Sequence, residues 1–153
     1  MIELRETGLC ACEALQAFEA RVDDAGAIVS FSGRVRRGGN GGDVTCLHLQ
    51  AYSPLTERGM TAAADQAMDR WPLTALSVIH RIGDMAPGET IVFVATAARH
   101  RRDAFEAADF LMDYLKTEAV FWKKETTPSG DNWIEPRAQD YQDQARWARN
   151  GDI

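Results

Sequence analysis

Long apolar runs, excess positive charge and cysteine are all missing or scarce in this chain of 153 residues. No apolar segment approaches the roughly 20 residues that a membrane-spanning helix needs, and the first residues lack the basic-then-apolar order of a signal peptide. The formal net charge of −6 argues against a general nucleic-acid binder. We therefore expect a cytoplasmic protein that binds neither membranes nor nucleic acid and folds as one domain over residues 1–153.

Cysteine occurs only at Cys10, Cys12 and Cys46, and this odd number fits reduced thiols in a cytosolic protein. A structural zinc site needs four ligands, whereas the three histidines are scattered along the chain. The sequence therefore predicts no metal site, and we expect no bound cofactor. Cys46 lies in an alternating segment and is expected to pack in the core.

Lysine is also rare, because 14 of the 17 basic side chains are arginine. The three lysines, Lys116, Lys123 and Lys124, fall in one short window. Lysine is a compact point charge whose pKa falls readily on desolvation, and unlike arginine it can act as an amine nucleophile or general base. The window therefore indicates a need for an amine, with chance clustering as the alternative.

The segment before these lysines has the period of a helix, with one apolar face formed by Phe105, Ala108, Met112, Leu115 and Ala119. At about 100° per residue, Lys116 projects at the edge of that face. A lysine there either extends its head into water or lines a cavity, and the two further lysines favour the cavity. Desolvation would then lower the pKa of Lys116 and suit it to proton transfer.

Hydrophobic periodicity and turn residues divide the chain into alternating helices and strands. Helices are expected at 10–22, from 54 to before Pro72, from 103 onward and at 138–150, and strands at 27–32, 44–52, 76–82 and 90–96. The strand at 90–96 is apolar on both faces and is therefore expected at the centre of its sheet. Residues 83–89 are expected to form a turn.

A glycine cluster at 38–43 invites comparison with a phosphate-binding loop. It lacks the terminal Gly-Lys-Ser/Thr and opens no helix, so we expect a connection between two antiparallel strands instead.

A basic cluster, Arg99-His100-Arg101-Arg102, immediately precedes the long helix, and Asp103 with Glu106 resembles a capping box. Helix N-termini carry free N–H groups and the positive end of the dipole, so cations there are repelled unless an anion neutralises them. The cluster therefore predicts an anion site, with a frayed, solvated loop as the alternative. The lysines lie at the other end of the same helix and are expected to share its cleft.

A series of short motifs runs in order along nearly the whole chain, from about residue 5 to the C-terminal helix. They are Phe31-Ser32-Gly33-Arg34-Val35-Arg36, Trp71-Pro72-Leu73, Ile79-His80-Arg81-Ile82-Gly83, Pro87-Gly88-Glu89, His100-Arg101, Met112-Asp113-Tyr114-Leu115-Lys116-Thr117, Phe121-Trp122-Lys123-Lys124-Glu125 and Gly130-Asp131-Asn132-Trp133. Together they resemble the large, catalytic subunits of molybdopterin synthase, and the Lys-Thr and Phe-Trp-Lys pairing is the most specific part.

The resemblance implies an α+β protein, an α/β hammerhead fold with an additional antiparallel β subdomain and a C-terminal helical tail at 138–153. It implies a homodimer within a heterotetramer, in which each large subunit binds a small ubiquitin-like sulfur-carrier subunit. That partner's C-terminal Gly-Gly carries a thiocarboxylate, and two such sulfurs convert cyclic pyranopterin monophosphate into the dithiolene of molybdopterin.

The resemblance also implies roles for particular residues. Lys116 and Lys123 match the catalytic lysines. The substrate-binding positions comprise those two lysines together with Arg34, Val35, Arg36, His100, Arg101, Lys124, Glu125 and Arg137. Arg34 stands where a lysine is common and arginines bracket the His100-Arg101 pair, but neither departure removes a needed charge. An arginine-rich helix N-terminus suits a cyclic phosphate, and sulfur transfer from an acyl carrier needs an electropositive pocket.

Two other functions remain as alternatives. A non-catalytic module could bind an acidic peptide tail in the same basic cleft. A cysteine persulfide sulfurtransferase is the weaker alternative, because no cysteine lies near the basic residues in the sequence.

Overall fold

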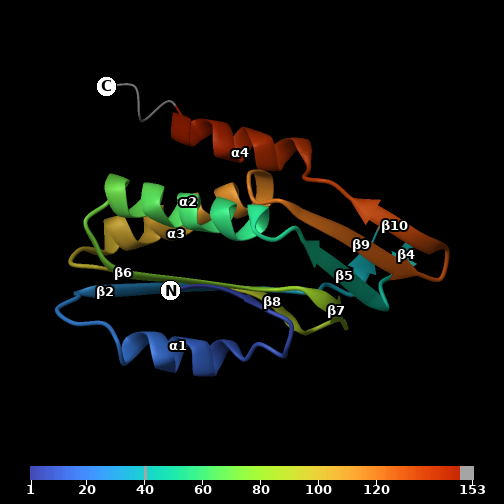
Figure 1. Cartoon of the computed structure of the whole chain (residues 1–153), viewed down its shortest axis with the longest axis horizontal. Helices are drawn as coiled ribbons and strands as arrows, with labels where there is room; N and C mark the ends of the chain where they lie inside the picture. Colours follow the sequence, from blue (N-terminus) through green and yellow to red (C-terminus); the bar gives the residue numbers. More distant parts are fainter. Residues whose placement is uncertain (40, 149–153) are drawn as a thin grey trace.

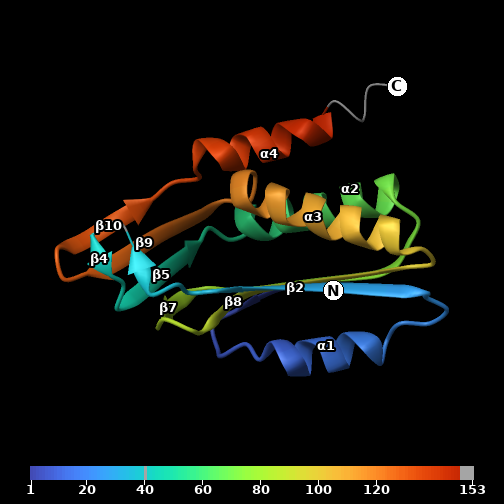
Figure 2. The ribbon, with the colours of Figure 1, turned by 180° about the vertical axis from the view of Figure 1, so that it is seen from behind.

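A four-stranded sheet with helices on both faces forms the larger part of the molecule (Figure 1). The structure is a computed structural model that describes residues 1–39 and 41–148, so residues 149–153 of the expected tail lie outside the described residues. The strands are β1 (Ile2–Arg5), β6 (Leu73–Arg81), β8 (Thr90–Ala98) and β2 (Ala27–Arg34), in that spatial order. Helix α1 (Ala11–Glu19) covers one face, and α2 (Leu55–Arg70) and α3 (Arg101–Thr117) cover the other (Figure 2).

Strand β8 lies between β6 and β2, antiparallel to both. From Val92 to Ala98 every residue of the strand is buried, because helices pack against both faces. The prediction of a central strand here is confirmed. Strand β1 pairs in parallel with β6 and closes the other edge of the sheet. Among the described residues, no helix is long and apolar enough to cross a membrane.

A second, wholly antiparallel sheet extends from one end of the first (Figure 1). Its strands are β10 (Gly130–Ile134), β9 (Phe121–Thr127), β5 (Cys46–Ala51) and β7 (Gly83–Met85), in that order. One face packs around a small apolar core formed by Val35, Val44, Leu47, Leu49 and Met85. The α+β class and the additional antiparallel subdomain expected from the sequence are therefore confirmed.

Strand β7 corrects the expectation that residues 83–89 form only a turn. Gly83 has a φ of +89°, a conformation that side chains disfavour. It lies where the chain leaves β6 and enters the second sheet, in which β7 pairs with β5. The glycine cluster does not join two paired strands as expected, because β2 and β5 lie in different sheets. Instead, β3 (Gly38–Gly39) and β4 (Gly42–Asp43) pair with each other inside the cluster as a short antiparallel hairpin.

The buried face of α3 differs from the expected one. Its buried residues are Ala104, Ala107, Ala108, Phe110, Leu111 and Leu115, whereas Phe105 is 60% exposed. Small alanines let the helix approach the sheet and α2 closely, and this packing rotates the buried stripe away from Phe105. The expected capping box is also wrong. The helix begins at Arg101, its N-cap His100 makes no side-chain cap, and Glu106 instead accepts a 3.0 Å hydrogen bond from the Trp71 indole.

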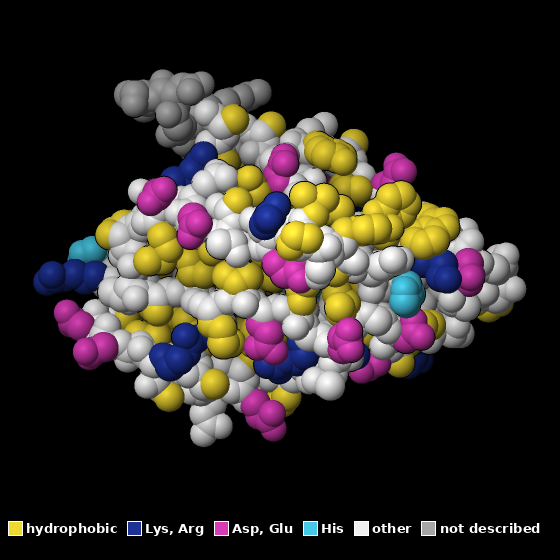
Figure 3. Space-filling view, in the orientation of Figure 1, with side chains coloured by type: hydrophobic (Ala, Val, Ile, Leu, Met, Phe, Trp, Pro, Cys, Tyr) yellow, Lys and Arg dark blue, Asp and Glu magenta, His cyan; other side chains and the backbone are white. Residues whose placement is uncertain are grey.

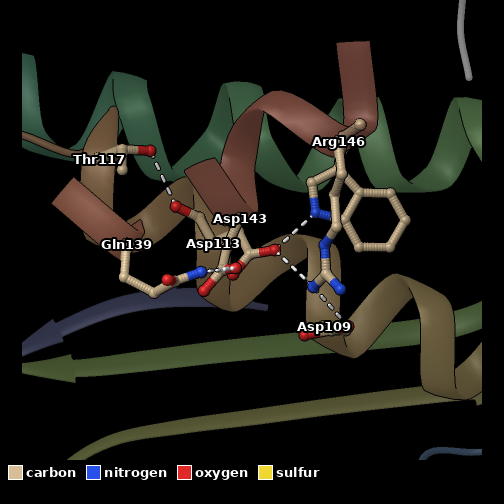
Figure 4. A network of polar contacts seen from close by, with 7 residues as sticks. Asp109, Asp113, Thr117, Gln139, Asp143 and Arg146 are labelled. Atoms are coloured by element: carbon tan, nitrogen blue, oxygen red, sulfur yellow. Dashed lines mark hydrogen bonds and ion pairs between the residues drawn. The ribbon is translucent and has the colours of Figure 1, made fainter. Parts of the chain in front are cut away.

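Helix α4 (Ala138–Ala148) docks on α3 of the same chain. Trp147 is buried against Trp71 and Phe110, with ring centroids 5.6 and 5.7 Å away. Its indole nitrogen donates to Asp113 at 2.6 Å, and Arg146 bonds Asp113 as well (Figure 4). The C-terminal helix is thereby held against the C-terminal half of α3.

Candidate active site

A pocket of about 520 Å³ opens where the C-terminal end of α3, the start of β9 and the segment leading into α4 meet. Four cationic side chains of the predicted site line it: Arg36, Lys116, Lys123 and Arg137. They come from the segment after β2, the end of α3, strand β9 and the segment before α4, and the docking of α4 carries Arg137 to the two lysines. The fold therefore concentrates positive charge here in a chain that is acidic overall.

Strand alternation separates the two adjacent lysines. Lys123 lies opposite Leu49 and Ile134 in the sheet and shares their inner face. Lys124 lies opposite His48 and Trp133 on the outer face, where its amine is 3.7 Å from Asp131 and 5.7 Å from the Trp133 ring. Lys124 is thus not brought to the pocket with Lys116 and Lys123.

Lys123 is the amine whose pKa is changed by its position in the pocket. Burial, and to a smaller extent the positive charge of Lys116, lower the pKa of Lys123 to about 8, while the carboxylate of Asp140 acts in the opposite direction. An amine with this pKa exchanges its proton readily near neutrality. Lys116, by contrast, is exposed at the rim. The expectation that Lys116 is desolvated is therefore wrong, because the apolar face of α3 is rotated away from it.

Asp140 lines the same pocket and was not among the predicted site residues. It is only 8% exposed. One carboxylate oxygen accepts the backbone N–H of Arg137 at 2.7 Å, and the other lies 3.4 Å from the Arg137 guanidinium. An acid at the third position of α4 that accepts an N–H just before the helix is the return half of a capping box. This signal was present in the sequence.

His80, on β6, packs behind the pocket residue Phe121. Its ring is stacked on Phe121 at 4.0 Å, and it is 4% exposed. Nδ1 lies 2.9 Å from the backbone carbonyl of Arg81 and therefore donates to it. Burial lowers the pKa of His80 to about 4, the charge of Lys123 adds to the decrease, and the bond to the carbonyl opposes it. His80 is consequently a neutral ring at physiological pH.

The neutral His80 predicts a loss of stability in mild acid. An unfolded histidine titrates near 6.5, so between pH 6.5 and about 4 the unfolded state binds more protons, and stability falls as the pH falls. Urea unfolding at pH 7 and pH 4.5 should show His80 contributing about 2 kcal/mol to the difference. His80→Asn keeps an N–H donor without the titration, so its unfolding free energy should change less between the two pH values. An equal change in both proteins would contradict this assignment.

Three other predicted residues lie around the pocket rather than in it. Arg34 donates two hydrogen bonds to the Gly88 carbonyl, at 3.0 and 2.8 Å, and lines a different depression. Val35 is buried in the small core. Glu125 faces inward beneath the β3–β4 hairpin, where a Cβ on Gly39 would lie 2.5 Å from its Oε2, and that oxygen has no hydrogen-bond partner among the described residues.

His100 and Arg101 lie in a separate basic pocket, with Arg99, Arg102 and the exposed Phe105. This pocket is at the N-terminal end of α3, and Lys116 is at the C-terminal end of the same 17-residue helix. A helix of that length spans about 25 Å. The expectation that both basic sets share one cleft is therefore wrong within a single chain.

The outer face of the second sheet carries an exposed aromatic cluster, formed by Tyr52, Trp122 and Trp133. Their rings meet edge to face, with centroids 6.0 and 5.9 Å apart. Figure 3 shows hydrophobic side chains gathered over this end of the molecule. Cys46 lies on this face as well, two residues before His48 on β5, and is half-buried rather than packed in the core.

Known proteins are similar to this chain in both sequence and fold. A sequence model of the MoaE protein family matches residues 6–118. The molybdopterin synthase catalytic subunit of Escherichia coli is 49% identical over 128 residues, covering 84% of this chain and 85% of that protein. The protein with the same name in Caulobacter vibrioides is 49% identical over 133 residues, covering 87% of each.

A solved structure gives the same result for the fold. The molybdopterin biosynthesis MoaE protein of Burkholderia ambifaria superposes with a TM-score of 0.82 at 40% identity, covering 97% of both chains. This agreement confirms the expected hammerhead fold with its added subdomain. With the family match extending over most of the chain, it places this protein in the MoaE family.

Proposed function

We propose that this chain is the catalytic subunit of a molybdopterin synthase. It transfers sulfur from the C-terminal thiocarboxylate of a small ubiquitin-like subunit to cyclic pyranopterin monophosphate, and so forms the molybdopterin dithiolene. The observation that carries the proposal is the pocket that joins Arg36, Lys116, Lys123 and Arg137, with the pKa of one amine lowered to about 8. Relatives with this name support it.

The pocket matches both reactants in charge. A thiocarboxylate and a cyclic phosphate are anions, and arginine is well suited to hold phosphate oxygens through paired N–H groups. In each transfer the thiocarboxylate sulfur forms a bond to a pterin side-chain carbon while a carbon–oxygen bond at that carbon breaks, and the oxygen leaves as water or on the opened phosphate. Water then cleaves the acyl–sulfur bond of the resulting thioester, which leaves the sulfur on the pterin and the carrier's terminus as a carboxylate. Lys123 holds or releases the proton during these steps, while Lys116, at the rim, supplies charge to the acyl oxygen.

The positions of His100 and Arg101 support a site shared between two copies. On one chain they lie about 25 Å along α3 from Lys116. A two-fold dimer places the same surface of each copy against its mate, so the His100 pocket of one copy can face the lysine pocket of the other. We assign His100 and Arg101 to the phosphate or pterin end of the substrate on this basis.

The direct test is to mix the protein with a thiocarboxylated small subunit and the pterin precursor, and to measure the dithiolene product. Formation of product supports the synthase. Binding of the carrier tail without product would instead support a non-catalytic module that recognises an acidic peptide in the same cleft. A cytoplasmic location stays a prediction.

The cysteines should be dispensable, because in this reaction the sulfur arrives on the carrier. Cys10 and Cys12 line a different depression, and Cys46 is on the outer face of the second sheet, so none lies in the described lysine pocket. Replacing Cys10 and Cys12 by serine and Cys46 by alanine should leave the turnover rate within about twofold of the wild type, because their thiols contact no reacting group. Loss of activity in the folded variant would favour a persulfide mechanism.

A further inference from the structure

The contacts of Asp140 set it apart from an ordinary surface acid at a helix start. Its carboxylate is buried, and it binds both the backbone and the guanidinium of Arg137, one of the four pocket cations. Among the carboxylates that line the described pocket, Glu118 and Glu135 are exposed, and Glu118 is bonded to Gln144. Asp140 is therefore the carboxylate that faces the cations from within the protein.

We propose that Asp140 is a positioning residue of the lysine pocket: its buried carboxylate fixes Arg137 and the first turn of α4 against the pocket, and its negative charge holds Lys123 and Lys116 in one site. The effect of Asp140 on catalysis rests on the proposed function, whereas its effect on the charges of the two lysines does not. It goes beyond the predicted substrate contacts, because Asp140 acts through the lysines and Arg137 and not on the substrate.

The charges around Lys123 explain why a buried carboxylate is needed. Lys116 faces it from α3, His80 is neutral, and Arg36 and Arg137 line the same pocket. Four cations in one cavity repel one another strongly when water is partly excluded. Asp140 on α4 is the partner that raises the pKa of Lys123 against burial and the charge of Lys116.

The cations of the pocket also change the pKa of Asp140. Burial alone would raise the pKa of its carboxyl, but the hydrogen bonds from Arg137 and the positive charge of Lys116 reverse the effect, so the pKa lies below its ordinary value. Asp140 therefore stays ionised at neutral pH. A residue that served only as a helix cap would act through its hydrogen bond to the Arg137 N–H and through the helix dipole, and removing its charge would leave the pKa of Lys123 unchanged.

The scarcity of lysine makes a direct test possible, since a lysine-labelled protein gives only three side-chain signals, from Lys116, Lys123 and Lys124. We would titrate these signals by NMR in the wild type and in Asp140→Asn, which keeps an oxygen acceptor but removes the charge. The midpoint of Lys123 should fall by at least about half a pH unit. Lys124, on the opposite face of the sheet, should titrate as in the wild type.

Control variants separate charge from capping. Asp140→Glu keeps the charge and places the usual capping-box acid at the third helical position, so Lys123 should titrate close to its wild-type midpoint. Asp143→Asn removes a half-buried acid of the same helix that does not line the described pocket, and it should leave the Lys123 midpoint unchanged. If Asp140→Asn does not fold, Asp140→Ser provides the uncharged variant with a smaller acceptor.

An unchanged Lys123 midpoint in the folded uncharged variant would overturn the proposal, whatever reaction the protein catalyses. In the synthase assay, Asp140→Asn should shift the ascending limb of the pH–rate profile to lower pH by the same amount as the NMR midpoint. A lower rate with an unshifted profile would mean a structural role only. If no dithiolene forms even with the wild type, the proposed function fails, while the NMR result still decides the role of Asp140.

Discussion

Replacing Lys123 by arginine is expected to lower the rate of single-turnover dithiolene formation by about 10²–10⁴-fold, the usual contribution of a general acid or base. Arginine keeps the positive charge but does not release a proton near neutral pH. Lys123 is partly buried in the pocket, with its pKa lowered to about 8, so proton exchange is the property that arginine removes. The assay uses preformed thiocarboxylate carrier, so that only the transfer steps are measured.

Lys124→Arg is the matched control, because Lys124 is the next residue on the same strand but faces outward. Its rate should stay near that of the wild type. Lys116→Arg tests the other pocket lysine, and we expect it to retain more activity than Lys123→Arg because Lys116 is exposed and supplies charge. If Lys116→Arg were the more damaged of the two, the proton-transfer role would belong to Lys116.

Mixing two inactive variants, Lys123→Ala and Arg101→Ala, is expected to restore about a quarter of the wild-type activity. If the two residues belong to one site formed by two copies, a mixed dimer has one site with both defects and one intact site. Random exchange makes half of the dimers mixed, and half of their sites are intact. Co-refolding or co-expression followed by the synthase assay measures this recovery.

Mixing Lys123→Ala with Lys116→Ala provides the control for this experiment. Both defects then lie in the same pocket, so every site of a mixed dimer carries one of them, and no activity should return. No recovery in the first mixture would show that Arg101 acts within its own chain or outside the site. Titrating Arg101→Ala with pterin precursor and with the small subunit separately would then distinguish these cases.

Much of the fold followed from local patterns. The two-sided apolar strand at Thr90–Ala98, the alternating strand around Leu47 and Leu49, and the two long helices all form close to where periodicity placed them. What periodicity could not supply was the choice of buried face on α3. Its wide apolar arc allowed two orientations, and contacts with the sheet, α2 and Trp147 select the one that leaves Phe105 exposed.

The site was predictable only in part for a similar reason. The lysine window indicated the correct region, but adjacency in sequence does not mean adjacency in a strand, so Lys123 and Lys124 separate. His100 and Arg101 were joined to the lysines through a shared helix, and the length of that helix keeps them apart. The capping contact of Asp140 left a signal in the sequence, but its place in the pocket depends on the docking of α4 on α3, a contact between segments with no common periodicity.

The two adjacent lysines on β9 also determine what a change in the length of the preceding connection would do. The connection from α3 to β9 is short, residues 118–120, so losing one residue there would slide the strand by one position and exchange its two faces. Lys124 would then occupy the inward position of Lys123, and the pocket would still contain an amine. Trp122 would replace Phe121 over His80, and the outward aromatic cluster would be broken. The pocket would thus keep its amine after such a deletion, whereas the outer surface would lose its aromatic cluster. Changes in the length of this connection should therefore be disfavoured mainly because they disrupt the contacts of that outer surface.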